Sequence, residues 1–482
     1  MSSLVSDFGR LVCCGLAMMI PVLGQGQSVL QAVQPEGLLS GRAPGDQLNP
    51  GVSLGPEGGY VVWQDNAAGP RGGIMARHLD ANGLPVGMPF QVNAAGQAVQ
   101  QMPRVAVLPG GGAAFVWEAG AVGFPAVYAR FMSAAGAFSK SGDIQVSKPL
   151  AAQTQRATVA LRVIRNNRPV LQRFRVDRTV AERRDLHTGV AAVPLADGSV
   201  LVGYSAYLRQ TTNQPVALPR VRMSGSALVT NSILVMQQTG RDFMQDIYFR
   251  RYTPTGEPIG PEVRVNEETR FNQRSPSFAA LANGNFVVVW ISENQGVPDS
   301  VIAQGLTRLD VYARIFNSQG LPLGGEIRLT DEAARDCGSP SVAGLAAGGF
   351  RVAWMQGSGT RVDGYDIVTR TFDNYGAPAG PVTRANTTTR GDQINPRVAS
   401  AGAGELVVWV SLNQEGTGES VYGRWLSGGA AVGSEFRVNT SRLGKHYQPA
   451  VAGLPSGRVL VSWSGFNGQG LFDVFGQLYQ AQ

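Results

Sequence analysis

The densest group of reactive side chains in this sequence is a run of arginines between residues 156 and 187. It holds nine arginines against three acids, and so carries +6 of a net chain charge of only +7. Guanidinium groups form bidentate hydrogen bonds with carboxylates and phosphates, and clustered cations attract polyanions. The run therefore predicts a ligand-binding surface, whose contact residues we expect to be Arg173, Arg175, Arg178, Arg183 and Arg184.

The expected ligands of this surface are an acidic glycan, lipopolysaccharide or a protein partner, and nucleic acid is not the expected partner in the cell. Apolar residues alternate with polar ones on both sides of the turn "NNRP", which predicts a hairpin over 155–187. Arg173 and Arg175 share one face of this hairpin, and Phe174 lies on the other. The structural alternative is a solvated hairpin in an arginine-biased chain.

Other reactive side chains form no recognisable centre. Glycoside hydrolysis needs two positioned carboxylates, and no spacing pairs the acids of the variable loops, Glu293, Asp299, Glu415 and Glu419. His78, His187 and His446 are far apart and make no zinc pattern with Cys337, which we expect to be buried. We predict no catalytic residue, metal or cofactor.

The elements that must position these side chains are repeated along the chain. A short apolar run ends in an aromatic residue seven times, and Trp117 follows Trp63 by 54 residues. The aromatic positions are Trp63, Trp117, Tyr204, Trp290, Trp354, Trp409 and Trp463. Runs such as "FVVVW" do not alternate, so both of their faces must be covered.

A second run of the form "VYARIF" follows each aromatic run, and it carries the arginines Arg77, Arg130, Arg250, Arg314, Arg370 and Arg424. A Gly-rich turn, a strand such as "FRVN" and a strand such as "NPRVAS" complete each unit. Because these arginines recur in framework strands, we interpret them as clamps between units that involve the Trp and a nearby Asp. The alternative is a ring of cationic ligand contacts.

Four-stranded units that are buried on both faces and repeated radially predict an all-β protein, a single closed β-propeller. Seven blades are expected, near 46–101, 102–154, 188–273, 274–338, 339–393, 394–448, and 449–482 plus 28–45. The last blade lacks a fourth strand, which we expect the N-terminal strand to supply by pairing 29–33 with 474–479. Two long connections within 118–289 leave an eighth blade as the alternative.

The units resemble a repeat of secreted bacterial proteins with the pattern "GGFVVxW…VYARxFDxxG…FxVN…PxVA". The resemblance covers nearly all of residues 25–482 and implies a propeller scaffold of unknown role. Arg10 followed by the apolar stretch 11–24 predicts a signal peptide over residues 1–24, and hence a secreted protein in the periplasm, at the cell surface or outside the cell.

Insertions at 155–187, 205–245 and 291–309 leave from one face, because connections into the first strand and between the middle strands share a face. Long loops on a rigid scaffold commonly carry binding sites. The sequence therefore predicts a binding or scaffold protein that uses these insertions. A glycan-processing enzyme, of lyase or sialidase type, and a structural domain of a cell-surface assembly are the alternatives.

Overall fold

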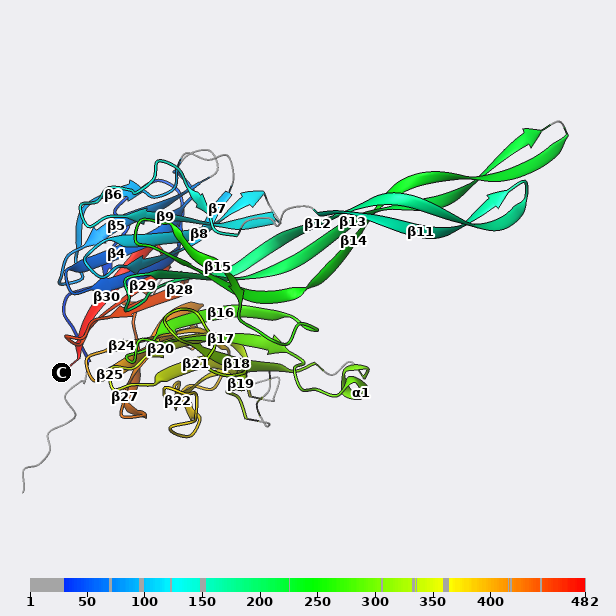
Figure 1. The fold of residues 1–482 in the computed structure, drawn as a ribbon. Coiled ribbons are helices and arrows are strands. Elements are labelled where there is room, and N and C mark those ends of the chain that lie inside the picture. The colour runs from blue at the N-terminus through cyan, green and yellow to red at the C-terminus, as the bar shows by residue number, and fades with distance from the viewer. Residues whose placement is uncertain are drawn as a thin grey trace, which may run out of the picture.

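The computed structural model shows an all-β molecule whose seven antiparallel sheets are arranged radially as a β-propeller (Figure 1). The described residues are 30–68, 72–94, 99–121, 124–147, 153–224, 226–304, 307–331, 334, 336–358, 364–414, 416, 418–442 and 444–481. The leader predicted at 1–24 lies outside them. In each blade the first strand lines a central channel, and the later strands follow outward in chain order.

Blades one and two comprise β3 (Gln47–Gly55), β4 (Gly58–Asp65), β5 (Gly73–Leu79), β6 (Pro85–Gln91), β7 (Val99–Val107), β8 (Ala113–Ala121), β9 (Phe124–Met132) and β10 (Ile144–Gln145). Blade three comprises β12 (Arg168–Pro194), β13 (Val200–Ser224), β14 (Ala227–Tyr252) and β15 (Pro258–Arg264), with β11 (Gln153–Arg165) added at its edge. Blade four comprises β16 (Gln273–Ala280), β17 (Phe286–Glu293), β18 (Leu309–Phe316) and β19 (Ile327–Arg328), with the helix α1 (Asp299–Ile302) between its middle strands.

Blades five and six comprise β20 (Gly338–Gly344), β21 (Phe350–Gly357), β22 (Tyr365–Phe372), β23 (Thr383–Arg384), β24 (Gln393–Ala401), β25 (Gly404–Leu412), β26 (Glu419–Ser427) and β27 (Ala430–Arg437). Blade seven comprises β28 (His446–Gly453), β29 (Arg458–Phe466), β30 (Phe472–Ala481) and the N-terminal strands β1 (Leu30–Ala32) and β2 (Gly37–Leu38). Within the described residues, no helix is long and apolar enough to cross a membrane.

The second strand of each blade is apolar on both faces because a different neighbour covers each face. In β17, Val287 packs in a buried cluster with Trp354 of the next blade. On the opposite face, Val288 and Trp290 pack with Phe249 of the preceding blade. Comparable clusters lie at the other five junctions of the described propeller, including the junction between blades seven and one. The unalternating runs therefore follow from burial between blades.

The two ends of the chain close the ring, as the sequence predicts. β1 pairs antiparallel with the end of β30, where Leu30 lies opposite Ala481 and Ala32 opposite Tyr479. β2 then pairs with the middle of β30, at Gly476 and Phe475. The pairing of 29–33 is thus shifted toward the C-terminal end of the predicted partner segment, and β2 covers the remainder. Closure removes the exposed edge of the last blade.

Blade three extends into a long projection (Figure 1), which we call the arm and define as residues 153–187 and 207–245. β12, β13 and β14 run without interruption from the propeller into the arm, and β11 pairs along β12. The segment 205–245 is therefore paired strand, and the interpretation of it as a loop beside the basic hairpin was wrong. The stretch 118–289 contains this arm and not an eighth blade.

Candidate functional site

The recurring arginines of the third strand hold neighbouring blades together. Arg314 donates from Nη1 to the carbonyl of Val265 in the preceding blade (2.9 Å) and from Nε to the carbonyl of Gly324 in its own blade (3.0 Å). Inter-blade bonds to main-chain carbonyls recur at Arg77, Arg130 and Arg424. Arg370 instead pairs with Asp331 of the preceding blade, and Arg250 lies over Tyr252. The clamps use carbonyls more than the Trp and Asp that we expected.

The recurring aromatic residues are all buried at blade junctions, and none of them faces a ligand site. The six Trp side chains and Tyr204 are at most 1% exposed. In three blades the indole N–H donates to a Gln of the first strand in the same blade, at distances of 2.5 Å for Trp117, 2.8 Å for Trp290 and 3.0 Å for Trp409.

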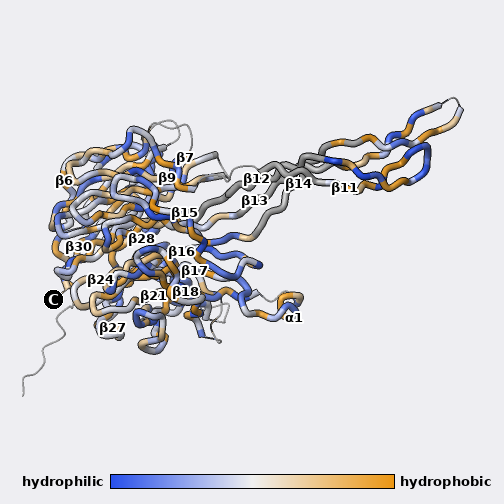
Figure 2. The backbone as a smooth tube through the Cα atoms, viewed as in Figure 1, coloured by the Kyte–Doolittle hydropathy of each residue, from blue (hydrophilic) through white to orange (hydrophobic). Residues whose placement is uncertain are grey.

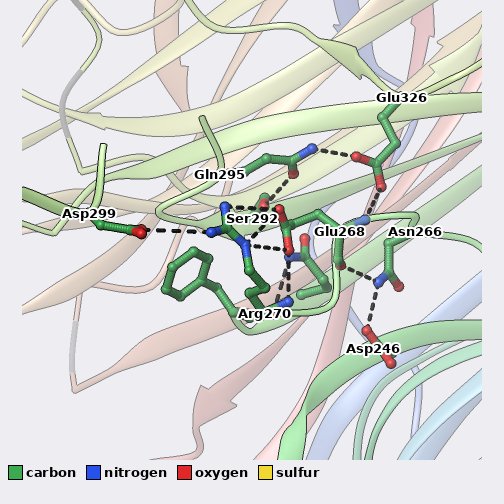
Figure 3. Close-up of polar contacts among 10 residues, drawn as sticks. Asp246, Asn266, Glu268, Arg270, Ser292, Gln295, Asp299 and Glu326 are labelled. Carbon is green, nitrogen blue, oxygen red and sulfur yellow. Dashed lines mark hydrogen bonds and ion pairs between the residues drawn. The ribbon is translucent and has the colours of Figure 1, made fainter. Parts of the chain in front are cut away.

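A polar cluster lies where blades three and four meet (Figure 3). Asn266 donates from Nδ2 to Asp246 Oδ1 (2.6 Å), and its own Oδ1 accepts the N–H of Ile247 (2.8 Å). Glu326 of blade four accepts main-chain N–H groups of the preceding blade, at Glu267 and Glu268. Gln295 donates to the other oxygen of Glu326.

This cluster is framework, because the repeat reproduces it elsewhere. Asn386 donates to Asp366 Oδ1 (2.6 Å), and Glu435 accepts the N–H groups of Thr387 and Thr388. The addition particular to blades three and four is an ion pair between Arg270 and Asp299 of α1, with 3.6 Å between Nη1 and Oδ1 (Figure 3). Both side chains are exposed, so this pair stabilises the fold little.

The described loop acids that the sequence offered for glycan chemistry have cationic partners. Glu293 pairs with Arg274 (3.1 Å) and Glu419 with Lys445 (3.2 Å), while Glu415 lies outside the described residues. His78, His187 and His446 lie in three different blades, and the described residues contain no group of ligands suited to a metal. Cys337 is buried, and burial raises the pKa of its thiol to about 12.

Arg173 and Arg175 lie exposed on β12 in the arm, opposite Ala160 and Thr158 of β11. Phe174, on the other face, is partly covered, which is the arrangement expected from the spacing. Arg178, Arg183 and Arg184 also belong to β12, but their side chains lie outside the described part. Five further exposed arginines of the described arm, at 162, 165, 168, 220 and 222, were not among the predicted contacts.

The arm also exposes apolar side chains, which the sequence analysis missed. Leu171 is 71% exposed, and Met223 and Leu228, a cross-strand pair near the tip of the second hairpin, are each 63% exposed. Leu218 and Ile233 form a second exposed pair in the same hairpin. We call residues 158–175 and 208–240 the outer arm, and Figure 2 shows apolar and polar residues interleaved along its coloured part. The alternation of 216–235 contains this signal, which an interpretation of the segment as a loop leaves out.

Contacts between its two hairpins fix the outer arm. The N–H of Ile164 donates to Ser232 Oγ (2.8 Å), and the N–H of Asn166 donates to Asn231 Oδ1 (3.0 Å). Asn167 Oδ1 accepts the N–H of Thr230 (2.6 Å). Asn166 and Asn167 form the tight turn of the first hairpin with φ values of 45° and 67°, a region that Asn tolerates well. The outer arm is thus one structure with a defined surface.

Two cavities open near the face from which the arm leaves. An apolar pocket of about 810 Å³ lies between blades six and seven, lined by Tyr447, Phe466 and Phe472 among others. A channel cavity of about 520 Å³ is lined by the first strands of all seven blades and contains Arg104 and Arg397. The two cavities share Asn395 and Gln448 in their walls.

Comparison with known proteins finds only distant structural likeness. The sequence matches no protein-family model and no curated protein. A protein of unknown function from Dyadobacter fermentans is 12% identical, covers 81% of this chain and 97% of its own, and gives a TM-score of 0.44. The NanB sialidase from Streptococcus pneumoniae is 10% identical over 92% of this chain and 70% of its own (TM-score 0.43). A polysaccharide lyase is 10% identical over 93% of both chains (TM-score 0.46). Likenesses this distant carry no argument about activity.

Proposed function

We propose that this protein is a secreted binding propeller whose arm captures an anionic amphiphile of the lipopolysaccharide class. The main support for this proposal is the amino-acid composition of the outer arm. Residues 158–175 and 208–240 contain eight arginines and neither Asp nor Glu. The acids of the basic segment, such as Asp177 and Asp185, lie nearer the propeller. Charge is thus segregated toward the tip.

The arginines suit a ligand that presents several phosphate or carboxylate groups. Arg173 and Arg175 are exposed on one strand face, so their two guanidinium groups can form bidentate hydrogen bonds with neighbouring anionic groups. Neither side chain forms an ion pair among the described residues. Their association with an anionic surface therefore needs no internal salt bridge to be broken, and it weakens with salt because exposed charges are screened.

The apolar side chains favour an amphiphile over a plain acidic glycan. Leu171 lies on the same face of the hairpin as Arg173 and Arg175 by its even spacing in β12. Leu228 and Met223 form a separate exposed apolar pair at the end of the second hairpin. Monomeric proteins rarely leave such residues grouped without a partner. A ligand with both anionic groups and acyl chains satisfies both kinds of side chain.

A predicted signal peptide favours a binding partner outside the cytoplasm. The predicted signal peptide, 1–24, would deliver residues 25–482 to the compartment in which surface lipids and polymers lie. A glycan-processing enzyme and a structural domain of a surface assembly are the alternative functions. The acids described above support the enzyme less, because Glu293, Asp299 and Glu419 are each held in an ion pair.

The test uses residues 25–482 and lipopolysaccharide micelles at two salt concentrations. The double variant Arg173→Gln/Arg175→Gln should bind roughly thirtyfold more weakly at low salt, since each cation near an anionic surface contributes about 1 kcal/mol. The matched control, Arg264→Gln/Arg390→Gln, removes two exposed charges from the propeller and should bind normally. Equal losses in both variants, or no binding by the parent, would overturn the proposal.

A second variant separates the two kinds of contact. Leu171→Ser/Leu228→Ser should weaken binding to lipopolysaccharide while leaving binding to polygalacturonate, which lacks acyl chains, unchanged. If the serine variant binds lipopolysaccharide as the parent does, the apolar surface has no part in recognition. The ligand class would then be an acidic glycan.

A further inference from the structure

The central channel is built from seven equivalent strands, each with the same backbone feature. The first strand of each blade has one residue with a left-handed φ, and the strand pairing shifts there. These residues are Asn49, Met102, Gly189, Ser275, Ser339, Asn395 and Gln448. Pro follows in every blade but the third, where Gly189 supplies the conformation without it. The feature sets one position of each strand at a common level of the channel.

That position lies just after the shift and opposite the residue before the recurring aromatic. Its seven occupants are Gly51, Arg104, Ala191, Ser277, Ser341, Arg397 and Ala450, and all of them line the cavity of about 520 Å³. Five of the seven are small, and two are arginines. The ring therefore breaks the symmetry of the repeat at two points, where large cations have room beside small neighbours.

Arg104 belongs to blade two and Arg397 to blade six, so they are four positions apart in one direction around seven blades and three in the other. They therefore project from nearly opposite walls of one narrow channel. Each donates from Nη1 to the carbonyl of its own preceding proline, at 2.7 Å for Arg104 and 2.8 Å for Arg397. Among the described residues, neither forms an ion pair with a carboxylate.

The electrostatics of this pair are unfavourable in the protein alone. Burial, and then the charge of Arg104, lower the pKa of Arg397 to about 10. Burial also lowers the pKa of Arg104, partly offset by Glu118. Like charges that share a poorly solvated site repel strongly. An anion between them would be attracted by both.

We propose that Arg104 and Arg397 form a binding site for a small oxyanion, such as a phosphate, a sulfate or the carboxylate of an acidic sugar, inside the channel. A guanidinium has five N–H donors, so each arginine retains donors beyond the bond to its proline. Ser277 and Ser341 line the same ring; their hydroxyl oxygens accept main-chain N–H groups at 3.2 Å each, which leaves each O–H to donate. This site is separate from the arm and does not depend on the function proposed for it.

The test measures the thermal stabilisation of residues 25–482 by sodium sulfate, sodium phosphate and sodium glucuronate, each against sodium chloride at matched ionic strength. A ligand that binds only the folded state raises the melting temperature. We expect at least one of the three probes to stabilise the parent more than chloride does. Sulfate and phosphate also stabilise folded proteins by exclusion from their surface, so only the part of the stabilisation that Arg397→Gln removes counts as binding. Such a part for glucuronate alone would identify a sugar carboxylate, and for sulfate or phosphate a free oxyanion.

Variants place the effect in the channel. Arg397→Gln should weaken the apparent affinity for the stabilising probe at least tenfold, and Arg397→Lys, which keeps a cation, should weaken it less. In chloride, Arg397→Gln should melt no lower than the parent because it relieves repulsion, a result that a purely structural arginine would not give. Arg264→Gln, an exposed arginine outside the channel, is the control. The proposal fails if Arg397→Gln responds to the probe as the parent does, or if no probe stabilises the parent more than chloride.

Discussion

The indole N–H of Trp290 donates to the side-chain oxygen of Gln273 at 2.8 Å, and this bond joins the first two strands of blade four inside a junction where the Trp is fully buried. The same pair recurs as Trp409 with Gln393 at 3.0 Å. A large apolar ring can be buried there because its one polar group has a partner. The pair shows how the repeat combines burial between blades with satisfied polar atoms.

Replacing Trp290 by Ala should therefore lower the free energy of unfolding by about 3–5 kcal/mol, because it leaves a cavity between blades and an unsatisfied Gln273. Denaturant titration of the purified variant measures this. Tyr375→Ala, at a residue that is 77% exposed, is the control and should change stability by no more than about 0.5 kcal/mol. Equal stability of Trp290→Ala and the parent would contradict packing between blades.

Deleting residues 25–36 should destabilise the ring, because it removes β1 and the carboxylate of Glu36. Leu30 is 8% exposed, and Glu36 accepts the N–H of Thr440 in the neighbouring blade at 2.6 Å. We expect a loss of about 3–5 kcal/mol, together with concentration-dependent aggregation through the edge of β30. Calorimetry and light scattering check both effects. A deletion of 25–28, which leaves β1 intact, should behave like the parent.

Glu118 predicts a pH dependence of stability. Burial raises the pKa of its carboxyl from 4.5 to about 7. The folded state therefore holds a proton that the unfolded state loses above its ordinary pKa, so stability is full below pH 4.5 and falls as the pH rises to about 7. The loss is on the order of 3 kcal/mol. Glu118→Gln should flatten this slope in unfolding curves measured between pH 4.5 and 8, and exposed Glu57→Gln should not.

Arg314→Gln should cost about 1–3 kcal/mol, because it leaves the carbonyls of Val265 and Gly324 without their donor. Arg390→Gln, at an exposed arginine, should cost almost nothing. The comparison by denaturant unfolding distinguishes a clamp from a surface charge. A loss as small as that of Arg390→Gln would mean that solvent satisfies these carbonyls equally well.

Periodicity predicted the propeller well because each blade repeats the same burial pattern. "FVVVW" shows that Val287, Val288 and Trp290 are covered on both faces, and the spacing of such runs counts the blades. The arm was not predictable in the same way. Its strands pair residues as far apart in sequence as Tyr207 and Gln245, and the long alternating segments looked like separate insertions. Strand pairing across such distances depends on tertiary contacts that local pattern does not encode.

The ring of seven residues that lines the channel shows a second limit of prediction from sequence. Arg104 and Arg397 stand in two copies of the pattern "PRVA", at a position that Gly, Ala or Ser occupies elsewhere, and alignment of the repeats could have found them. A buried ion pair between Arg351 and Glu405 (3.1 Å) across blades five and six was visible in the same way, as charges inside "GFRVAW" and "GELVVW". The sequence marks these exceptions, but only the radial arrangement shows which of them meet.

The uninterrupted strands of the arm have a mechanical consequence. Residues 207–224 of β13 would extend by ~60 Å at the rise of an antiparallel strand. A load applied at the tip therefore acts at the end of a cantilever rooted in blade three. Tension along the arm shears the pairing of β11 with β12, of β12 with β13 between Val180 and Pro194, and of β13 with β14. Shear shares the force among many bonds at once, so a propeller that binds a surface through its arm, as proposed above, would withstand pulling while its body stays several nanometres away.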